Sequence, residues 1–188
     1  MPAGDAGARS DAEGLPPIAV LNELQAADFE ALMAPLFEGA PRFLARLAAA
    51  RPIASYADLW PRALAVARAM PEAEQLELID AHPRLGAVPA SVSSMSFREQ
   101  GYDRPVPAAT VPGAEEVAAE LARLNAAYEA RFGFRFCVFV NGRSREALVP
   151  VLATALDANR PAEIRRALGD VVAIAADRAR KLAASPVR

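Results

Sequence analysis

The chain has 188 residues, of which 53% are hydrophobic and 23% charged, and its formal net charge is -2 at pH 7. This length suits one domain, since a chain of that size can bury roughly 70% of the surface that it exposes when unfolded. The slightly acidic balance and the scattered basic residues argue against nucleic acid as the main partner, and a single cysteine excludes an internal disulfide.

Signals for membrane insertion, secretion and zinc binding are lacking in the sequence. No apolar stretch approaches the ~20 residues needed to span a bilayer, and the first residues, MPAGDAGARSDAEG, lack the apolar core of a secretory signal. Residues 1–16 are predicted to be a disordered leader before a single domain at 17–188. With one histidine and one cysteine, a zinc site of the Cys/His type is excluded. We expect a cytoplasmic protein with no membrane partner and no metal.

The N-terminal part is predicted to form helices that are separated by proline. Helical spacing begins at Ile18, and the segment 22–39 carries an apolar stripe that Pro35 is expected to limit or kink. A second helix is expected to start at Pro41 and to end before Pro52. The apolar stripe consists of Phe29, Leu32, Met33 and Phe37.

Two more helices are expected before the only histidine of the chain. Ser55 and Asp58 have the spacing of a capping box and predict that a helix starts there. The segment 71–81 begins with proline and soon has two glutamates, which the dipole of a first helical turn favours. Because Pro83 disfavours the helical conformation in the residue before it, we expect this helix to end at about Ala81.

The middle of the chain, Gly86–Gly113, is predicted to be a long irregular loop rich in proline and serine. A short helical turn over 94–100 is expected to interrupt it. Such a long connection in a compact domain is usually functional or disordered. A strong helix over 112–133 is expected to follow, with an acidic first turn and Gly133 at its end.

The segment FRFCVFVNG (134–142) resembles a strand locally, and its Asn-Gly pair is typical of a hairpin turn. Because no partner strand is recognisable on either side, we expect an extended apolar segment packed against helices. Ser144 is expected to cap a helix over about 145–158, and a last helix is expected from about Pro161 to Ala184. The predicted fold is therefore all-α: a single-domain helical bundle with a long irregular loop and one extended apolar segment.

The only histidine, His82, stands directly before Pro83 at the end of a predicted helix. As a surface residue it would cap the helix C-terminus, where a cation is favoured by about 0.3 to 1 kcal/mol. The same position would keep the imidazole protonated nearer neutral pH and able to donate a proton into a cleft. Residue type and position leave both interpretations open.

Ser96, Glu99 and Gln100 lie at i, i+3 and i+4 and therefore share one face of a helical turn. By spacing, Ser96 and Glu99 form another capping box. Alternatively, all three side chains contact one polar ligand, with the carboxylate acting as a base or orienting His82.

Arg178 interrupts an apolar stripe on the last predicted helix. Its stem can lie along the apolar surface with the guanidinium in water. If the guanidinium is buried, it needs a carboxylate, from the protein itself or from a substrate. The stripe consists of Leu168, Val171, Ala175, Arg178 and Leu182.

The extended segment at 136–140 is most simply explained as apolar core, in which Cys137 is a small buried hydrophobic residue rather than a nucleophile. An extended and unpaired backbone also needs partners for its N–H and C=O groups. A polar heterocycle bound beside it can supply them.

Several segments together resemble the 2-oxo-4-hydroxy-4-carboxy-5-ureidoimidazoline (OHCU) decarboxylases of uric acid degradation, over about residues 18–184. The resemblance rests on the order and spacing of LNELQAADFEALMAPLFEGAP, EQLELIDAHPRLG, SFREQ, LNAAYEARFGFRFCVFVNGRSREALVPVL and RPAEIRRALGDVVAIAADRARKL. It implies an all-helical bundle that forms a homodimer and uses neither a metal nor an organic cofactor. It also implies a small ureidoimidazoline substrate that loses CO2 to give (S)-allantoin.

The resemblance also implies the site residues. The histidine of the family's His-Pro pair corresponds to His82, and the acid of its Ser-x-x-Glu-Gln motif corresponds to Glu99. These two would act as catalytic residues that manage the proton of the substrate hydroxyl and protonate the carbon that CO2 leaves. The implied substrate-binding residues are Pro83, Ser96, Phe97, Arg98, Gln100, Phe136, Cys137, Val138, Phe139, Val140 and Arg178.

The chain departs from the family pattern at several places. Arg135 stands where the family often has proline, Arg42 where it often has an aromatic residue, and the loop after His82 is shorter than in some relatives. One alternative is a diverged homologue acting on a related ureide, with Arg135 altering the pocket wall. Another is a non-catalytic helical interaction module. Only an enzyme is expected to place His82, Glu99 and Arg178 around one solvent-reachable cavity.

Overall fold

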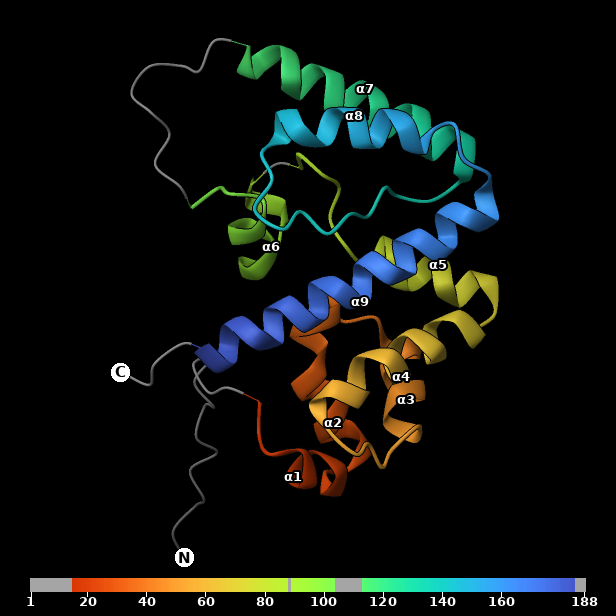
Figure 1. Cartoon of the computed structure of the whole chain (residues 1–188), viewed down its shortest axis with the longest axis vertical. Helices are drawn as coiled ribbons and strands as arrows, with labels where there is room; N and C mark the ends of the chain where they lie inside the picture. The colour runs from red at the N-terminus through yellow and green to blue at the C-terminus, as the bar shows by residue number, and fades with distance from the viewer. Residues whose placement is uncertain (1–14, 88, 104–112, 185–188) are drawn as a thin grey trace, which may run out of the picture.

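The computed structural model describes residues 15–87, 89–103 and 113–184, and every regular element within these ranges is a helix (Figure 1). The predicted all-α class is confirmed. The predicted leader lies almost wholly outside the described residues. One long helix crosses the molecule between the N-terminal helices and a pair of C-terminal ones (Figure 1). The crossing helix and the pair are α9 (Arg160–Ala184), α7 (Ala114–Phe132) and α8 (Arg145–Ala155).

The first helical segment, in which Pro35 is expected to limit or kink the helix, is divided into three. It forms α1 (Ile18–Glu23), α2 (Ala26–Met33) and the 3₁₀ helix η1 (Ala34–Phe37). Contacts with a distant loop accompany the end of α1: the Asn22 side chain exchanges hydrogen bonds of 2.8 and 2.9 Å with the backbone of Ile53. The change from α2 to η1 beside Pro35 agrees with the prediction. An apolar stripe carries no information about contacts with a distant loop, so the division between α1 and α2 was not predictable from spacing.

The next three helices agree with the predictions. They are α3 (Pro41–Ala49), α4 (Tyr56–Ala69) and α5 (Glu72–Asp80). The Ser55 hydroxyl caps α4 by accepting a hydrogen bond of 3.1 Å from the Asp58 N–H. α5 ends one residue before the predicted Ala81, and Pro71 serves as its N-cap. His82 is thereby placed in the turn directly after α5.

The long loop contains two short helices, η2 (Pro89–Ser91) and α6 (Ser94–Glu99). α6 confirms the helical turn predicted here. Its N-cap is Ser93, whose hydroxyl accepts a hydrogen bond from the Ser96 N–H. The capping role suggested for Ser96 is therefore wrong, and the Ser96 hydroxyl is available for other contacts. Residues 88 and 104–112 of the loop lie outside the described residues.

The segment 134–140 is extended and, in the described part of the chain, pairs with no strand, as predicted. It starts after Gly133, whose φ of +78° suits the glycine that ends α7. It lies between α7 and α9, because Phe136 contacts the Tyr128 ring of α7 and Cys137 accepts a hydrogen bond from α9. The Asn-Gly turn that follows leads into α8, capped by Ser144 as predicted, rather than into a returning strand.

α9 packs against α4, α5 and η1, so its apolar stripe is buried along the helix. Arg178 lies in this buried stripe and is only 2% exposed. The guanidinium is therefore held inside the protein, beside η1 and α6.

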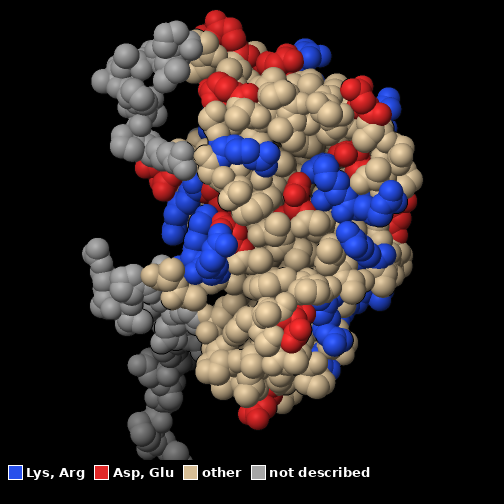
Figure 2. Space-filling model, viewed as in Figure 1, with Lys and Arg blue, Asp and Glu red and all other residues tan. Residues whose placement is uncertain are grey.

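The charges on the surface are mixed in sign. On the face shown in Figure 2, Lys and Arg side chains lie among Asp and Glu side chains rather than forming one basic field. Within the described residues, each helix is too short or too polar to span a bilayer.

Candidate active site

A cavity of about 280 Å³ opens where four segments meet: the turn after α5, α6, the extended segment and α9. The sequence predicted that His82, Glu99 and Arg178 surround one cavity, and all three line it. The other predicted residues in its wall are Pro83, Ser96, Gln100, Phe136, Cys137, Val138, Phe139 and Val140. Its size lies near the lower limit of ligand pockets, about 300 Å³, and suits a small molecule.

Two of the predicted substrate-binding residues, Phe97 and Arg98, do not line this cavity. The Phe97 ring packs against Tyr102 at 5.4 Å, and Arg98 is exposed. The helical period explains the difference, because Ser96, Glu99 and Gln100 share one face of α6 while the two residues between them point elsewhere.

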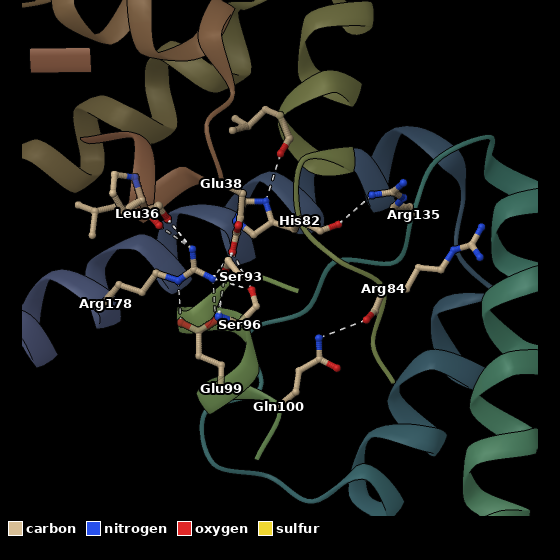
Figure 3. Close-up of polar contacts among 12 residues, drawn as sticks. Leu36, Glu38, His82, Arg84, Ser93, Ser96, Glu99, Gln100, Arg135 and Arg178 are labelled. Atoms are coloured by element: carbon tan, nitrogen blue, oxygen red, sulfur yellow. Dashed lines mark hydrogen bonds and ion pairs between the residues drawn. The ribbon is translucent and has the colours of Figure 1, made fainter. Parts of the chain in front are cut away.

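His82 is buried, with only 3% of its surface exposed. Its Nδ1 lies 3.2 Å from the carbonyl oxygen of Leu78, which can only accept a hydrogen bond, so Nδ1 carries the proton (Figure 3). Nε2 is then the unprotonated nitrogen. Among the described residues, this buried atom has no hydrogen-bond partner. The ring thus brings a free proton acceptor to the wall of the cavity.

The protonation state of His82 differs from the one expected from its position. Burial and the nearby Arg178 guanidinium lower its pKa to about 4, although the Glu38 carboxylate and the bond to Leu78 oppose the shift. The expectation of a surface cap, protonated by the helix dipole, is wrong. Desolvation outweighs the dipole here, because an imidazolium that leaves water loses more than a helix C-terminus returns.

Arg178 donates all of its guanidinium N–H groups to protein acceptors (Figure 3). Nε and Nη2 bind the two oxygens of Glu99 at 2.7 and 2.8 Å. Nη2 also contacts Glu38 and the Ser96 hydroxyl, and Nη1 contacts the carbonyl oxygens of Pro35 and Leu36 at 3.0 and 3.3 Å. The carboxylates that a buried arginine requires are therefore the protein's own.

Glu38 is a site residue that the sequence analysis did not single out. Its Oε1 contacts Arg178 at 2.7 Å and accepts hydrogen bonds from the hydroxyls of Ser96 and Ser93 at 2.7 and 2.8 Å. Burial alone would raise the pKa of Glu38, but the Arg178 charge and these hydrogen bonds outweigh it, so the pKa falls below its ordinary value. The residue has φ of +53°, which is unusual for a non-glycine residue. The sequence shows only a Glu-Gly pair before a helix-starting proline.

The sequence suggested that Glu99 could orient His82, but the structure does not show this contact. The two Glu99 oxygens form the paired contact with Arg178, whereas the His82 ring is hydrogen-bonded to Leu78. The carboxylate whose charge acts on His82 is Glu38. Arg178 lies between the two acids and joins α6 to η1.

The turn that carries His82 is fixed from two sides. The Gln100 amide donates to the carbonyl oxygen of Arg84 at 3.2 Å and accepts from the Gly86 N–H at 2.9 Å. On the other side, the Arg135 guanidinium contacts the carbonyl oxygen of Asp80 at 2.6 Å. It also contacts the carbonyl oxygen of His82 at 3.4 Å (Figure 3). Arg135 does not line the cavity, so its departure from the family pattern does not alter the wall.

The extended segment is held from behind by α9. Arg166 donates to the carbonyl oxygen of Cys137 at 2.9 Å, and Asp170 accepts a hydrogen bond from the Phe139 backbone. Backbone groups of alternate residues in an extended chain point to opposite sides, so those of Val138 face away from α9. Burial raises the pKa of Cys137 to about 12, which leaves it an uncharged thiol.

The sequence analysis also missed several residues of the cavity wall. Asp177 and Lys181 follow the cavity along α9, and the turn after the extended segment adds two more. The missed residues are Leu85, Asn141, Gly142, Ile174, Asp177 and Lys181.

In the described ranges, the acidic, histidine and cysteine side chains form no group of three or more that could hold a metal ion.

Comparison with known proteins places this site in a family. The OHCU decarboxylase family profile matches residues 22–180. The uric acid degradation bifunctional protein PucL of Bacillus subtilis (strain 168) is 30% identical over 155 residues, covering 82% of this chain and 30% of PucL. The uric acid degradation bifunctional protein of Bacillus sp. (strain TB-90) is 28% identical over 159 residues, with coverages of 82% and 30%. This chain thus spans about 30% of the length of these curated relatives.

Two solved structures have the same fold. A crystal structure of OHCU decarboxylase in the presence of (S)-allantoin has a TM-score of 0.59 at 22% identity, covering 79% of this chain and 94% of that one. A crystal structure of (S)-allantoin synthase has a TM-score of 0.61 at 18% identity, covering 89% of this chain and 54% of that one. The profile match extends over most of the sequence and includes every residue of the cavity wall except Lys181. The chain therefore belongs to the OHCU decarboxylase family.

Proposed function

We propose that this chain decarboxylates OHCU to (S)-allantoin without a cofactor, with His82 as the group that carries the proton. The observation that supports this most strongly is the buried imidazole, whose Nε2 has no partner within the described residues and which lines a cavity of substrate size. A buried polar atom left unpaired costs about 1–3 kcal/mol. In a non-catalytic helical module, an unpaired Nε2 would only destabilise the fold. In an enzyme, the same atom can accept a proton from the substrate.

In the first step, Nε2 of His82 takes the proton of the substrate hydroxyl. The bond between the ring carbon and the carboxylate breaks, and its electron pair moves into the adjacent ring C=N. CO2 leaves, the ring nitrogen takes one proton from water, and an enolate remains. A positioned general base typically contributes about 10²–10⁴-fold to such a step.

In the second step, the imidazolium returns the proton to the ring carbon that carries the ureido group, and the enolate becomes the ring carbonyl. The low pKa of His82 keeps Nε2 unprotonated at neutral pH and makes the imidazolium a strong proton donor in this second step. Because the contact with Leu78 fixes the ring, a substrate bound in one orientation receives the proton at one face only, as formation of a single enantiomer requires.

The remaining wall binds and orients the substrate. Val138 and Gln100 border the cavity, and we assign to the ring and ureido arm the backbone groups of Val138 and the second N–H of Gln100 Nε2, whose first N–H is donated to Arg84. Arg178, with its donors used by Glu38, Glu99 and Ser96, acts chiefly by holding these groups in place rather than as a free anion receptor. We also propose, on the resemblance and the composition alone, a homodimer located in the cytoplasm.

The reaction itself is tested by adding freshly generated OHCU to the purified protein. We expect the absorbance of OHCU to decay faster than in buffer. The allantoin that forms should give the circular dichroism signal of the (S) enantiomer. Decay at the buffer rate would refute the assignment. Faster conversion of a different ureide than of OHCU would instead favour a diverged homologue. Arg135 does not support that alternative, because it lies outside the cavity wall.

A further inference from the structure

The proposed substrate carries a carboxylate, and the inner cavity offers it no available cation. Two residues of the described wall are cationic, Arg178 and Lys181. The guanidinium of Arg178 is occupied by the two oxygens of Glu99, by Glu38, by Ser96 and by carbonyl oxygens. The carboxylate must therefore be received elsewhere.

The inner part of the site repels an anion. Glu38 and Glu99 carry two negative charges against the one positive charge of Arg178, and His82 is neutral because its pKa is about 4. The inner cluster thus has a net charge of -1. An anionic substrate that enters this site needs an attractive group near the opening.

Lys181 is placed at that opening. It lies on α9 three residues beyond Arg178, borders the same cavity, and its side chain is 63% exposed. Its ammonium contacts Asp177 at 2.6 Å, and the Asp177 carboxylate, itself buried, is shared with Arg180. These three residues carry two positive charges and one negative charge, so the rim has a net charge of +1.

We infer that Lys181 receives the substrate carboxylate at the cavity mouth, an assignment that rests on the proposed function. An ammonium has three N–H donors on a flexible stem, so it can contact Asp177 and a ligand carboxylate together. Decarboxylation removes the charge that Lys181 binds, so this contact stabilises the ground state at least as much as the transition state. Lys181 therefore acts on substrate affinity and leaves the rate of the bound complex largely unchanged.

The test compares Lys181→Met with Arg180→Met in steady-state kinetics on OHCU. Both changes remove one positive charge beside Asp177, but only Lys181 lines the cavity. For a partly exposed ion pair we expect KM to rise about three- to tenfold in Lys181→Met, with kcat within about twofold of the unmodified protein. Arg180→Met should change KM by less than about twofold, and Lys181→Arg should restore most of the affinity.

A neutral ligand separates charge recognition from general damage to the site. (S)-Allantoin lacks the carboxylate, so its inhibition constant should be the same for Lys181→Met and the unmodified protein. An unchanged KM for OHCU in Lys181→Met, or an equal loss of allantoin affinity, would refute the role of Lys181 while leaving the decarboxylase assignment intact. Absence of accelerated OHCU decay by the unmodified protein would refute the proposed function, and the role of Lys181 with it.

Discussion

The His82→Asn variant is expected to turn over OHCU about 10²–10⁴ times more slowly than the unmodified protein. Asparagine can keep a hydrogen bond to the Leu78 carbonyl but has no basic nitrogen to accept the hydroxyl proton. The chain has no second histidine to take over this task. The measurement is the decay of freshly generated OHCU at saturating concentration, after subtraction of decay in buffer.

Two controls separate chemistry from folding in this variant. Far-ultraviolet circular dichroism and the melting temperature should match those of the unmodified protein, and (S)-allantoin should bind with similar affinity. A correctly folded His82→Asn protein with near-normal kcat would show that the imidazole does not carry the proton. The mechanism proposed above would then have to be abandoned.

The Arg178→Met variant is expected to lose about 3–5 kcal/mol of folding stability and nearly all activity. The change leaves Glu38 and Glu99 in a largely buried site without their counter-charge, and breaking a buried ion cluster by removing one partner typically costs that amount. Chemical denaturation at pH 7 measures the loss. Arg123→Met is the matched control, because its pair with Glu120 is exposed to solvent and is expected to contribute little to folding stability.

A triple variant tests the physical cause of this loss. In Arg178→Met with Glu38→Gln and Glu99→Gln, the uncompensated charges are gone, so a substantial part of the stability should return although activity does not. If Arg178→Met is as stable as Arg123→Met, the buried ion cluster does not hold α6, η1 and α9 together. Equal stability of the single and triple variants would likewise contradict a charge-based explanation.

Local signals in the sequence were sufficient for most of the fold. Proline at 41, the Ser55 cap and Gly133 act through backbone geometry and short-range hydrogen bonds, and each element edge that they predict is found in the structure. The extended segment was predicted from its lack of a partner strand. The division between α1 and α2 was missed, because it coincides with hydrogen bonds from Asn22 to a residue 31 positions away.

The sequence predicted which residues line the site better than it predicted their charge states and hydrogen-bond partners. Helical spacing and the family resemblance correctly placed Ser96, Glu99, Gln100 and the extended segment in the cavity wall, whereas Phe97 and Arg98 do not line it. The charge state of His82 was wrong, because burial is a property of the packed molecule that a helix end does not reveal. Glu38 was missed for a similar reason: its partner Arg178 lies 140 residues further along the chain.

Titration of His82 by nuclear magnetic resonance tests the central claim most directly, because a chain with one histidine gives one set of imidazole signals. Above about pH 5 we expect a neutral ring protonated on Nδ1, with a midpoint near pH 4 rather than the 6.5 of an unperturbed histidine. The unfolded chain binds this proton more readily than the folded one, so stability should fall as the pH falls from about 6.5 to 4. A midpoint near 6.5, or a neutral ring protonated on Nε2, would contradict the account of His82 as a buried proton acceptor.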